Sequence, residues 1–222
     1  MRSQPLSILL LLLGGLANAT PLAARQAATS TAAAVCARNS GTPGTGGDID
    51  MVAAILAIMP TSKSCSGSDT RPEDCRTAEE AAPFVAKAHA DLTPAESAAL
   101  LALMALESVE FKYKHNISPG RAGQGTANMM MPEFVKEYAT DLFGAEQVAG
   151  KGPAEVLEMV TPDEHNFASA AWFYTKYCSD KQESLKTGTD AGWMDYMACI
   201  GVDGANPERM EYWNRAKQAF NL

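Results

Sequence analysis

The sequence has few histidines and no excess of basic residues, and each shortage excludes a class of function. Its 222 residues include three histidines, His89, His115 and His165. No metal-ligand spacing links them, so we expect no metal site. Lysine and arginine number 18 against 26 aspartates and glutamates, which leaves a net charge of -8. Phosphate backbones and anionic membrane surfaces repel so acidic a chain, so we expect no nucleic-acid partner.

Several motifs and patterns are also missing. No Gly-x-Ser-x-Gly motif is present, which argues against a serine hydrolase. The glycine-rich stretch 41–47 follows no strand and precedes no Lys-Ser/Thr pair, so it is not a phosphate-binding loop. The chain shows no internal repeat and no sustained alternation of apolar and polar residues, so few strands are expected. We therefore predict a mainly α-helical protein that carries no cofactor.

One apolar run stands out, at the N-terminus. Arg2 precedes the run 6–16, and Ala17-Asn18-Ala19 has the small-x-small pattern at which signal peptidase cleaves. The run is shorter than the roughly 20 apolar residues that cross a bilayer, and no later segment is long enough. These features predict a signal peptide over 1–19 and a secreted, extracellular protein without a membrane span.

The five cysteines are typical of disulfide bonds in an exported protein. We expect Cys65 to pair with Cys75 and Cys178 to pair with Cys199, because each pair flanks a polar loop. Spacing alone does not prove this pairing. Cys36 is a free thiol or displaces a partner in either pair, and no histidine context supports a catalytic cysteine.

The remaining chain divides by composition into two parts. Residues 20–47 are rich in Ala, Thr, Ser and Gly and predict a flexible N-terminal segment. Residues 48–222 suffice for one helical domain, which we expect to be a monomer. Periodicity and capping signals predict helices at 48–59 (capped by Asp48), 77–89, 93–114, 132–143, 153–160, 162–177, 191–199 and 207–220. A disulfide-pinned loop is expected at 61–76, and a glycine-rich loop or short hairpin at 115–131.

The helix predicted at 93–114 has the clearest signals in the chain. Thr93 is a predicted N-cap, Pro94 takes the first helical position and Glu96 completes a capping box. The run 98–106 is apolar on every face, which is typical of a buried helix. The helix is therefore expected to form the centre of the core.

Glu107 follows this apolar run and is the leading candidate for a catalytic residue. Apolar neighbours, the negative end of the helix and Glu110 three residues on all disfavour its charged form. A carboxyl group that stays protonated near neutral pH is what a glycosidic general acid requires. The alternative is a half-exposed Glu107 that pairs with Lys112 or Lys114.

The residues after Glu107 resemble the goose-type lysozyme and soluble lytic transglycosylase superfamily. In that superfamily a buried helix ends in a catalytic Glu-Ser pair, followed by an Asn/Ser-Pro/Gly loop and a Gly-Leu-Met-Gln-x-x-Pro segment. The matching positions are Glu107, Ser108, Asn116, Ser118, Pro119, Gly120, Gly123, Gly125, Asn128, Met129, Met130, Met131 and Pro132. Weaker matches at Asn166, Ala170, Phe173, Tyr174, Tyr196 and Gly201 extend the resemblance over roughly 93–220.

The resemblance implies a lysozyme-like helical domain and a muramidase or transglycosylase activity on a β-1,4-linked amino-sugar polymer. Glu107 would be the general acid and base. The expected partner is an extracellular polysaccharide. The resemblance implies peptidoglycan, whereas chitin or chitosan suits the charge better, because a neutral or cationic polymer repels an acidic protein less. The expected substrate-binding residues are Ser108, Gln124, Asn128, Met129 and Tyr196.

Departures from the family pattern leave a second hypothesis open. With the prolines aligned at Pro132, the family glutamine falls on Met129 and its glycine on Thr126. The alternative is therefore a non-catalytic secreted effector or glycan-binding protein on the same scaffold. No spacing rule selects a second carboxylate among Glu110, Glu133 and Asp141.

Two features of the glycine-rich loop carry further predictions. Asn116-Ile117-Ser118 is a sequon and predicts N-glycosylation at Asn116. Pro119 directly after it disfavours its use, and a glycan there would crowd the expected substrate. The three methionines at 129–131 form either a soft wall under a ligand or part of the core.

Overall fold

The computed structural model describes residues 49–67 and 71–222, and these residues form helices but no strand. The mainly α-helical prediction is confirmed. The predicted signal peptide, the segment 20–47, Asp48 and Cys36 lie outside the described residues. Within the described part of the chain, no helix has the length and apolar character needed to cross a membrane.

The helices are α1 (Met51–Ile58), α2 (Ala78–Ala88), α3 (Pro94–Glu107), α4 (Pro132–Phe143), α5 (Ala145–Val148), α6 (Pro153–Val160), α7 (Asp163–Tyr177), α8 (Gln182–Leu185), α9 (Asp190–Ile200) and α10 (Pro207–Ala219), with 3-10 turns at Pro60–Lys63 and Ser179–Lys181.

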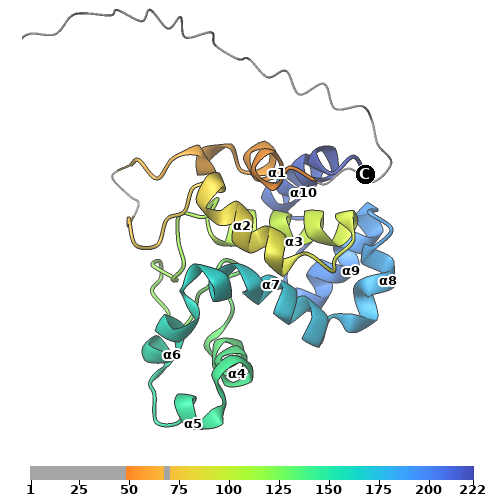
Figure 1. Cartoon of the computed structure of the whole chain (residues 1–222). Coiled ribbons are helices and arrows are strands. Elements are labelled where there is room, and N and C mark those ends of the chain that lie inside the picture. The colour runs from red at the N-terminus through yellow and green to blue at the C-terminus, as the bar shows by residue number, and fades with distance from the viewer. Residues whose placement is uncertain (1–48, 68–70) are drawn as a thin grey trace, which may run out of the picture. The chain divides into compact units, whose positions relative to one another are not determined.

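Helix α3 lies at the centre of the core, as its sequence predicts. Every residue from Ala95 to Ala105 is buried, and α3 contacts α1, α7, α8 and α10 (Figure 1). The predicted capping box is present: the Thr93 side chain accepts from the Glu96 N–H, and the Glu96 carboxylate accepts from the Thr93 N–H. Burial of the Glu96 carboxylate is compensated by the Tyr174 hydroxyl, which donates to it at 2.7 Å.

Helix α3 ends at Glu107, seven residues before the predicted end at Lys114. The next residues, from Val109 to Phe111, all have positive φ and so cannot continue a right-handed helix. The Ser108 hydroxyl closes the end by donating to the Met104 carbonyl at 2.6 Å and accepting from the Phe111 N–H at 2.9 Å. The chain therefore turns sharply next to Glu107.

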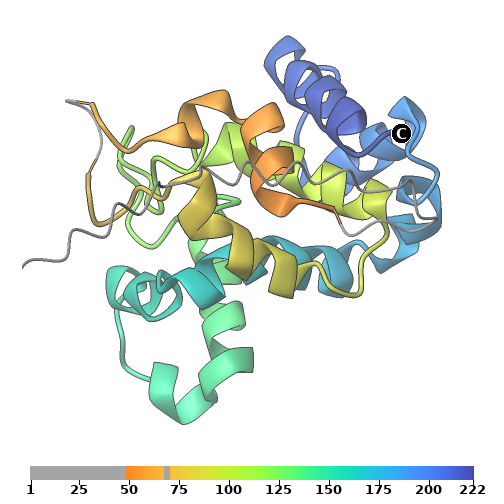
Figure 2. The same ribbon diagram turned by 45° about the horizontal axis from the view of Figure 1, so that its top comes forward.

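The glycine-rich segment after α3 is an irregular loop. Isolated bridges join Gly125 to His115 and to Met130, and no ladder of strands extends from them. The Thr126 N–H donates to the Lys114 carbonyl at 2.8 Å, which brings the two sides of the loop together. Helices α4, α5 and α6 follow this loop; α4 contacts both of the others, and α4 and α6 lie side by side in both views (Figures 1 and 2).

Other local differences from the prediction have simple causes. The cap of α1 is Asp50, whose carboxylate accepts from the Ala53 N–H, so the predicted Asp48 cap is wrong. Helices α5 and α8 have four residues each, too few for a periodic pattern. The structure contains disulfides Cys65–Cys75 and Cys178–Cys199, the two pairs that the sequence favoured.

Candidate functional site

Two adjoining hollows meet at Glu107, Gln124 and Met129, and we call the pair the cleft. One hollow, the apolar arm, has a volume of about 270 Å³ and the other, the mixed arm, about 430 Å³. The apolar arm is lined by residues of α3, the glycine-rich loop, α4, α7, the last residue of α9 and the segment after it. The mixed arm is lined by the end of α3, the turn after it and the glycine-rich loop. Besides the three shared residues, the apolar arm is lined by Leu103, Asn128, Met130, Met131, Phe134, Phe173, Ile200, Gly201 and Val202, and the mixed arm by Val109, Tyr113, His115, Asn116, Ile117 and Ser118.

Glu107 lines both arms and is paired with an arginine. The Arg209 Nη2 donates to the Glu107 Oε1 at 2.6 Å, and the two side chains are 13% and 21% exposed. The sequence predicted apolar neighbours, the negative end of the helix and Glu110 around this carboxyl group, and it did not predict a cationic partner. The alternative pairing is wrong, because Lys112 donates to the Thr61 and Ser64 carbonyls and Lys114 to Asp163. Arg209 binds one oxygen of the Glu107 carboxylate, and Glu107 is still part of the lining of both arms.

Glu110 is buried and hydrogen-bonded to two other elements. Its Oε2 accepts from the Thr61 N–H at 2.7 Å and from the Thr61 hydroxyl at 2.6 Å, while its Oε1 accepts from the Tyr212 hydroxyl at 3.0 Å. Burial, with the bond to Glu110, raises the pKa of Tyr212 to about 12. Glu110 therefore holds the turn after α3, and neither it nor Glu133 nor Asp141 lines the cleft as a second carboxylate.

Three of the five predicted binding residues reach the cleft. Gln124, Asn128 and Met129 line it, and Gln124 donates to the Met129 carbonyl at 3.2 Å. Ser108 is 1% exposed and is used up as the cap of α3, so its predicted role is wrong. Tyr196 is fully buried, with its ring edge-on to Tyr174 at 5.3 Å, so it belongs to the core.

The methionine run serves both purposes that its sequence suggested. All three side chains line the apolar arm. Met130 is also 4% exposed and belongs to the core, so the wall of the cleft continues directly into the packed interior.

Asn116 holds the loop with its side chain. Its amide nitrogen donates to the Gln124 Oε1 at 2.6 Å, and its Oδ1 accepts from the Gly120 N–H at 3.2 Å. A glycan on this nitrogen would remove the bond to Gln124 and project beside the mixed arm. Glycosylation of Asn116 stays a prediction.

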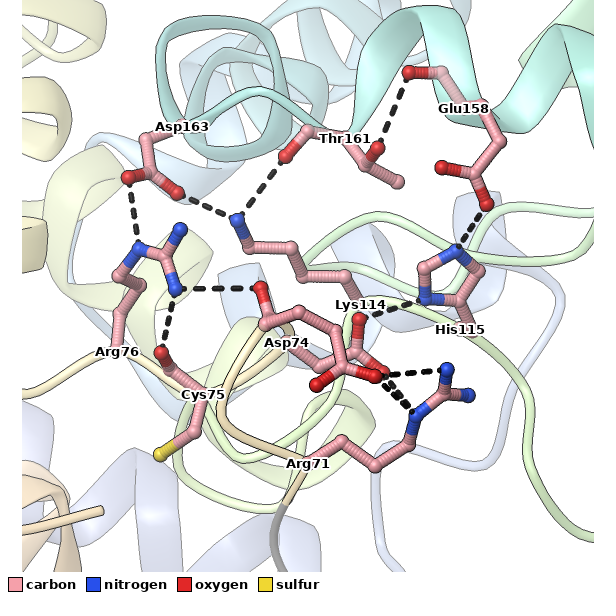
Figure 3. Close-up of polar contacts among 10 residues, drawn as sticks. Arg71, Asp74, Cys75, Arg76, Lys114, His115, Glu158, Thr161 and Asp163 are labelled. Carbon is pink, nitrogen blue, oxygen red and sulfur yellow. Dashed lines mark hydrogen bonds and ion pairs between the residues drawn. The ribbon is translucent and has the colours of Figure 1, made fainter. Parts of the chain in front are cut away.

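A charged network ties the loop at the mixed arm to neighbouring elements (Figure 3). The His115 Nδ1 lies 2.9 Å from the Asp74 Oδ1, and its Nε2 lies 3.0 Å from the Glu158 Oε1. Next to it, Lys114 and Arg76 both bind the Asp163 carboxylate, at 2.5 and 2.7 Å. Burial would raise the pKa of Asp163, but these two hydrogen bonds outweigh it and lower that pKa. The network links the Cys65–Cys75 loop, the glycine-rich loop, α6 and α7.

Sequence reasoning missed the partner of Glu107 and several lining residues. Arg209 lies 102 positions after Glu107, and no local pattern relates the two. Phe173 comes from α7, Ile200 is the last residue of α9 and Val202 follows it, and apolar residues at these places are equally typical of the core. Only the packing of these elements against α3 could have identified them.

Comparison with known proteins gives one informative relative. No family model matches the chain, and no solved structure matches it. A bifunctional dioxygenase (DOX)-epoxy alcohol synthase (EAS) from Fusarium oxysporum (strain Fo5176) is 43% identical over 158 residues. The match covers 64% of this chain and 12% of the relative, so the chain corresponds to a small part of that protein.

This relative corrects the function predicted from the sequence. Its name specifies oxygenation and epoxy alcohol formation rather than glycan cleavage. The resemblance to the lysozyme and transglycosylase superfamily, the glycoside hydrolase or transglycosylase activity and the glycan-binding alternative are therefore wrong. The prediction treated Glu107 as an isolated buried acid. In the structure Glu107 forms an ion pair with Arg209, which favours the charged carboxylate over the protonated general acid. Secretion and an extracellular polysaccharide partner stay untested predictions.

Proposed function

We propose that this protein binds an uncharged oxygenated hydrocarbon chain, such as a fatty alcohol or epoxy alcohol, in the cleft. The observation that carries the proposal is the composition of the two arms. Each arm combines apolar and polar groups. Leu103, Phe134 and Phe173 are apolar walls of one arm, Val109 and Ile117 are apolar walls of the other, and both arms share the Gln124 amide and the Glu107 carboxylate. Sites for small molecules are mostly apolar, with a few polar groups that fix orientation.

The relative supports the same chemical class. An epoxy alcohol synthase forms a product that carries an epoxide and a hydroxyl group. A domain that occurs with such activities and has an amphipathic cleft is suited to hold a substrate or product of that kind.

The charge of the lining favours an uncharged ligand over a carboxylate. Glu107 is the carboxylate that both arms share, and its partner Arg209 is not among the lining residues. A ligand hydroxyl can donate to the Glu107 carboxylate, whereas a ligand carboxylate placed there meets a like charge. Gln124 and Asn128 add amide groups at the junction of the arms.

Oxygenation itself calls for a redox-active metal or prosthetic group, and the residues present do not fit one. Across 49–67 and 71–222, no group of three or more His, Cys, Asp and Glu side chains could hold a metal ion. Both nitrogens of His115 face carboxylates, and His89 is enclosed by the core. The proposal is therefore confined to binding, and no oxygenation step is derived.

We expect the protein to bind oleyl alcohol at least about tenfold more tightly than oleate, because the two have similar hydrocarbon chains but one ends in a neutral hydroxyl and the other in a charged carboxylate. Isothermal titration of the protein into each probe, below the solubility limit of oleyl alcohol and the micellar concentration of oleate, measures both affinities. Glu107→Gln removes the charge but keeps the shape, so this variant should reduce the preference. Absence of oleyl alcohol binding by the wild type, or a preference unchanged in Glu107→Gln, contradicts the proposal.

A further inference from the structure

Left-handed backbone is concentrated around the cleft. Among the described residues, the non-glycine positions with positive φ are Val109, Glu110, Phe111, Thr126, Met129 and Asn221. All but Asn221 belong to the turn after α3 or to the glycine-rich loop. A left-handed backbone is unfavourable for an L-residue, and strain of this kind clusters at functional sites.

The turn after α3 needs this conformation to bury its next two residues. The Glu110 N–H donates to the Ala105 carbonyl at 2.7 Å, and its carboxylate binds Thr61. The Phe111 ring is 2% exposed and packs edge-on against Phe167 at 5.0 Å. These contacts account for the left-handed backbone at residues 110 and 111.

They do not explain why residue 109 is a valine. Val109 has a φ of 52° and its side chain is 55% exposed, so it adds little to the core. Valine is β-branched and among the residues least suited to a left-handed conformation, whereas asparagine adopts it far more readily. Folding alone would favour asparagine or glycine here.

The position of Val109 supplies the missing reason. Its side chain lines the mixed arm together with Glu107 and Met129. Met129 shares the same strain, with a φ of 51°, and lines both arms. Two residues with a left-handed backbone thus place apolar side chains beside Glu107, the carboxylate that would accept a hydrogen bond from the ligand's hydroxyl.

We propose that Val109 contacts the apolar part of the ligand, next to the ligand's polar group. Valine at this left-handed position lowers the stability of the folded protein. The inference rests on the proposed function and adds a specificity-determining position to it. A ligand that covers Val109 removes apolar surface from water, which favours a hydrocarbon segment at this point of the cleft.

The test exchanges valine and asparagine at two left-handed positions. Val109→Asn should raise the melting temperature by about 2–4 °C, because the strain is relieved. It should also weaken oleyl alcohol binding by about fivefold, because apolar contact is lost. The matched control is Asn221→Val at a φ of 57°, outside the cleft, which should lower the melting temperature and leave the affinity unchanged.

Each result decides between the two proposals. A stabilised Val109→Asn variant with wild-type affinity overturns the contact role while the proposed function stands. A variant that is not stabilised overturns the premise of strain. If the wild type fails to bind oleyl alcohol, the proposed function fails and the contact role of Val109 fails with it.

Discussion

Lowering the pH from 7 to 4 is expected to remove about 3 kcal/mol of the free energy of unfolding through one side chain, His89. His89 lies at the C-terminal cap of α2, is 4% exposed, and neither ring nitrogen has a hydrogen-bond partner. Burial lowers the pKa of His89 from 6.5 to about 4.

The sign follows from the two protonation states. Above about pH 6.5 the imidazole is neutral in both the folded and the unfolded chain, so it adds no pH dependence. As the pH falls toward about 4, the unfolded chain binds a proton that the folded chain does not accept. Stability therefore falls through this interval and levels off below it.

Urea unfolding of the wild type and of His89→Leu at both pH values measures the effect. Carboxylates titrate in the same range, so the informative quantity is the difference between the two proteins. The variant should lose less stability on acidification than the wild type. Equal losses in both would show that His89 does not couple folding to pH.

Replacing Gly125 by alanine is expected to lower the free energy of unfolding by about 3 kcal/mol and to abolish binding in the cleft. A Cβ at this position would lie 2.3 Å from the Lys114 carbonyl oxygen and 2.7 Å from the Leu157 Cδ1. The Lys114 carbonyl cannot move away freely, because it accepts from the Thr126 N–H and the Lys114 side chain binds Asp163. The loop that carries Gln124, Asn128 and Met129 must then shift.

Gly152→Ala provides the matched control. A Cβ there meets the exposed Glu155 carboxylate at 3.4 Å, and the φ of Gly152 is -73°. This variant should bind oleyl alcohol as the wild type does and lose about 1 kcal/mol of stability, because Gly152 is the N-cap of α6 and alanine caps less well than glycine. Thermal melts and titrations of both variants make the comparison. A Gly125→Ala variant that melts and binds like Gly152→Ala would contradict the close approach of the loop to Lys114.

Most helices could be predicted because their signals are local. The Thr93–Glu96 capping box and the apolar run before Glu107 predict α3 and its burial without reference to any other part of the chain. The end of α3 could not be predicted in this way. It depends on Thr61 and Phe167, which bind and pack against the turn from distant segments.

The functional prediction failed for a related reason. Glu-Ser pairs, glycines and methionines occur in many proteins, and their order over 107–132 resembled a family whose chemistry this chain's relative does not share. Glu107, Gln124, Asn128 and Met129, which that resemblance placed in one binding site, do line one arm of the cleft, and their role in binding stays a prediction.

The sequence by itself determined the helical class and the central position of α3, because these depend on caps and periodicity. Only the tertiary structure decided the environment of Glu107. The Arg209 guanidinium reaches it from α10 at 2.6 Å, and Phe173 and Ile200 complete the apolar arm from two other segments. An ion pair between residues 102 positions apart leaves no trace in local sequence, since it arises from helix packing.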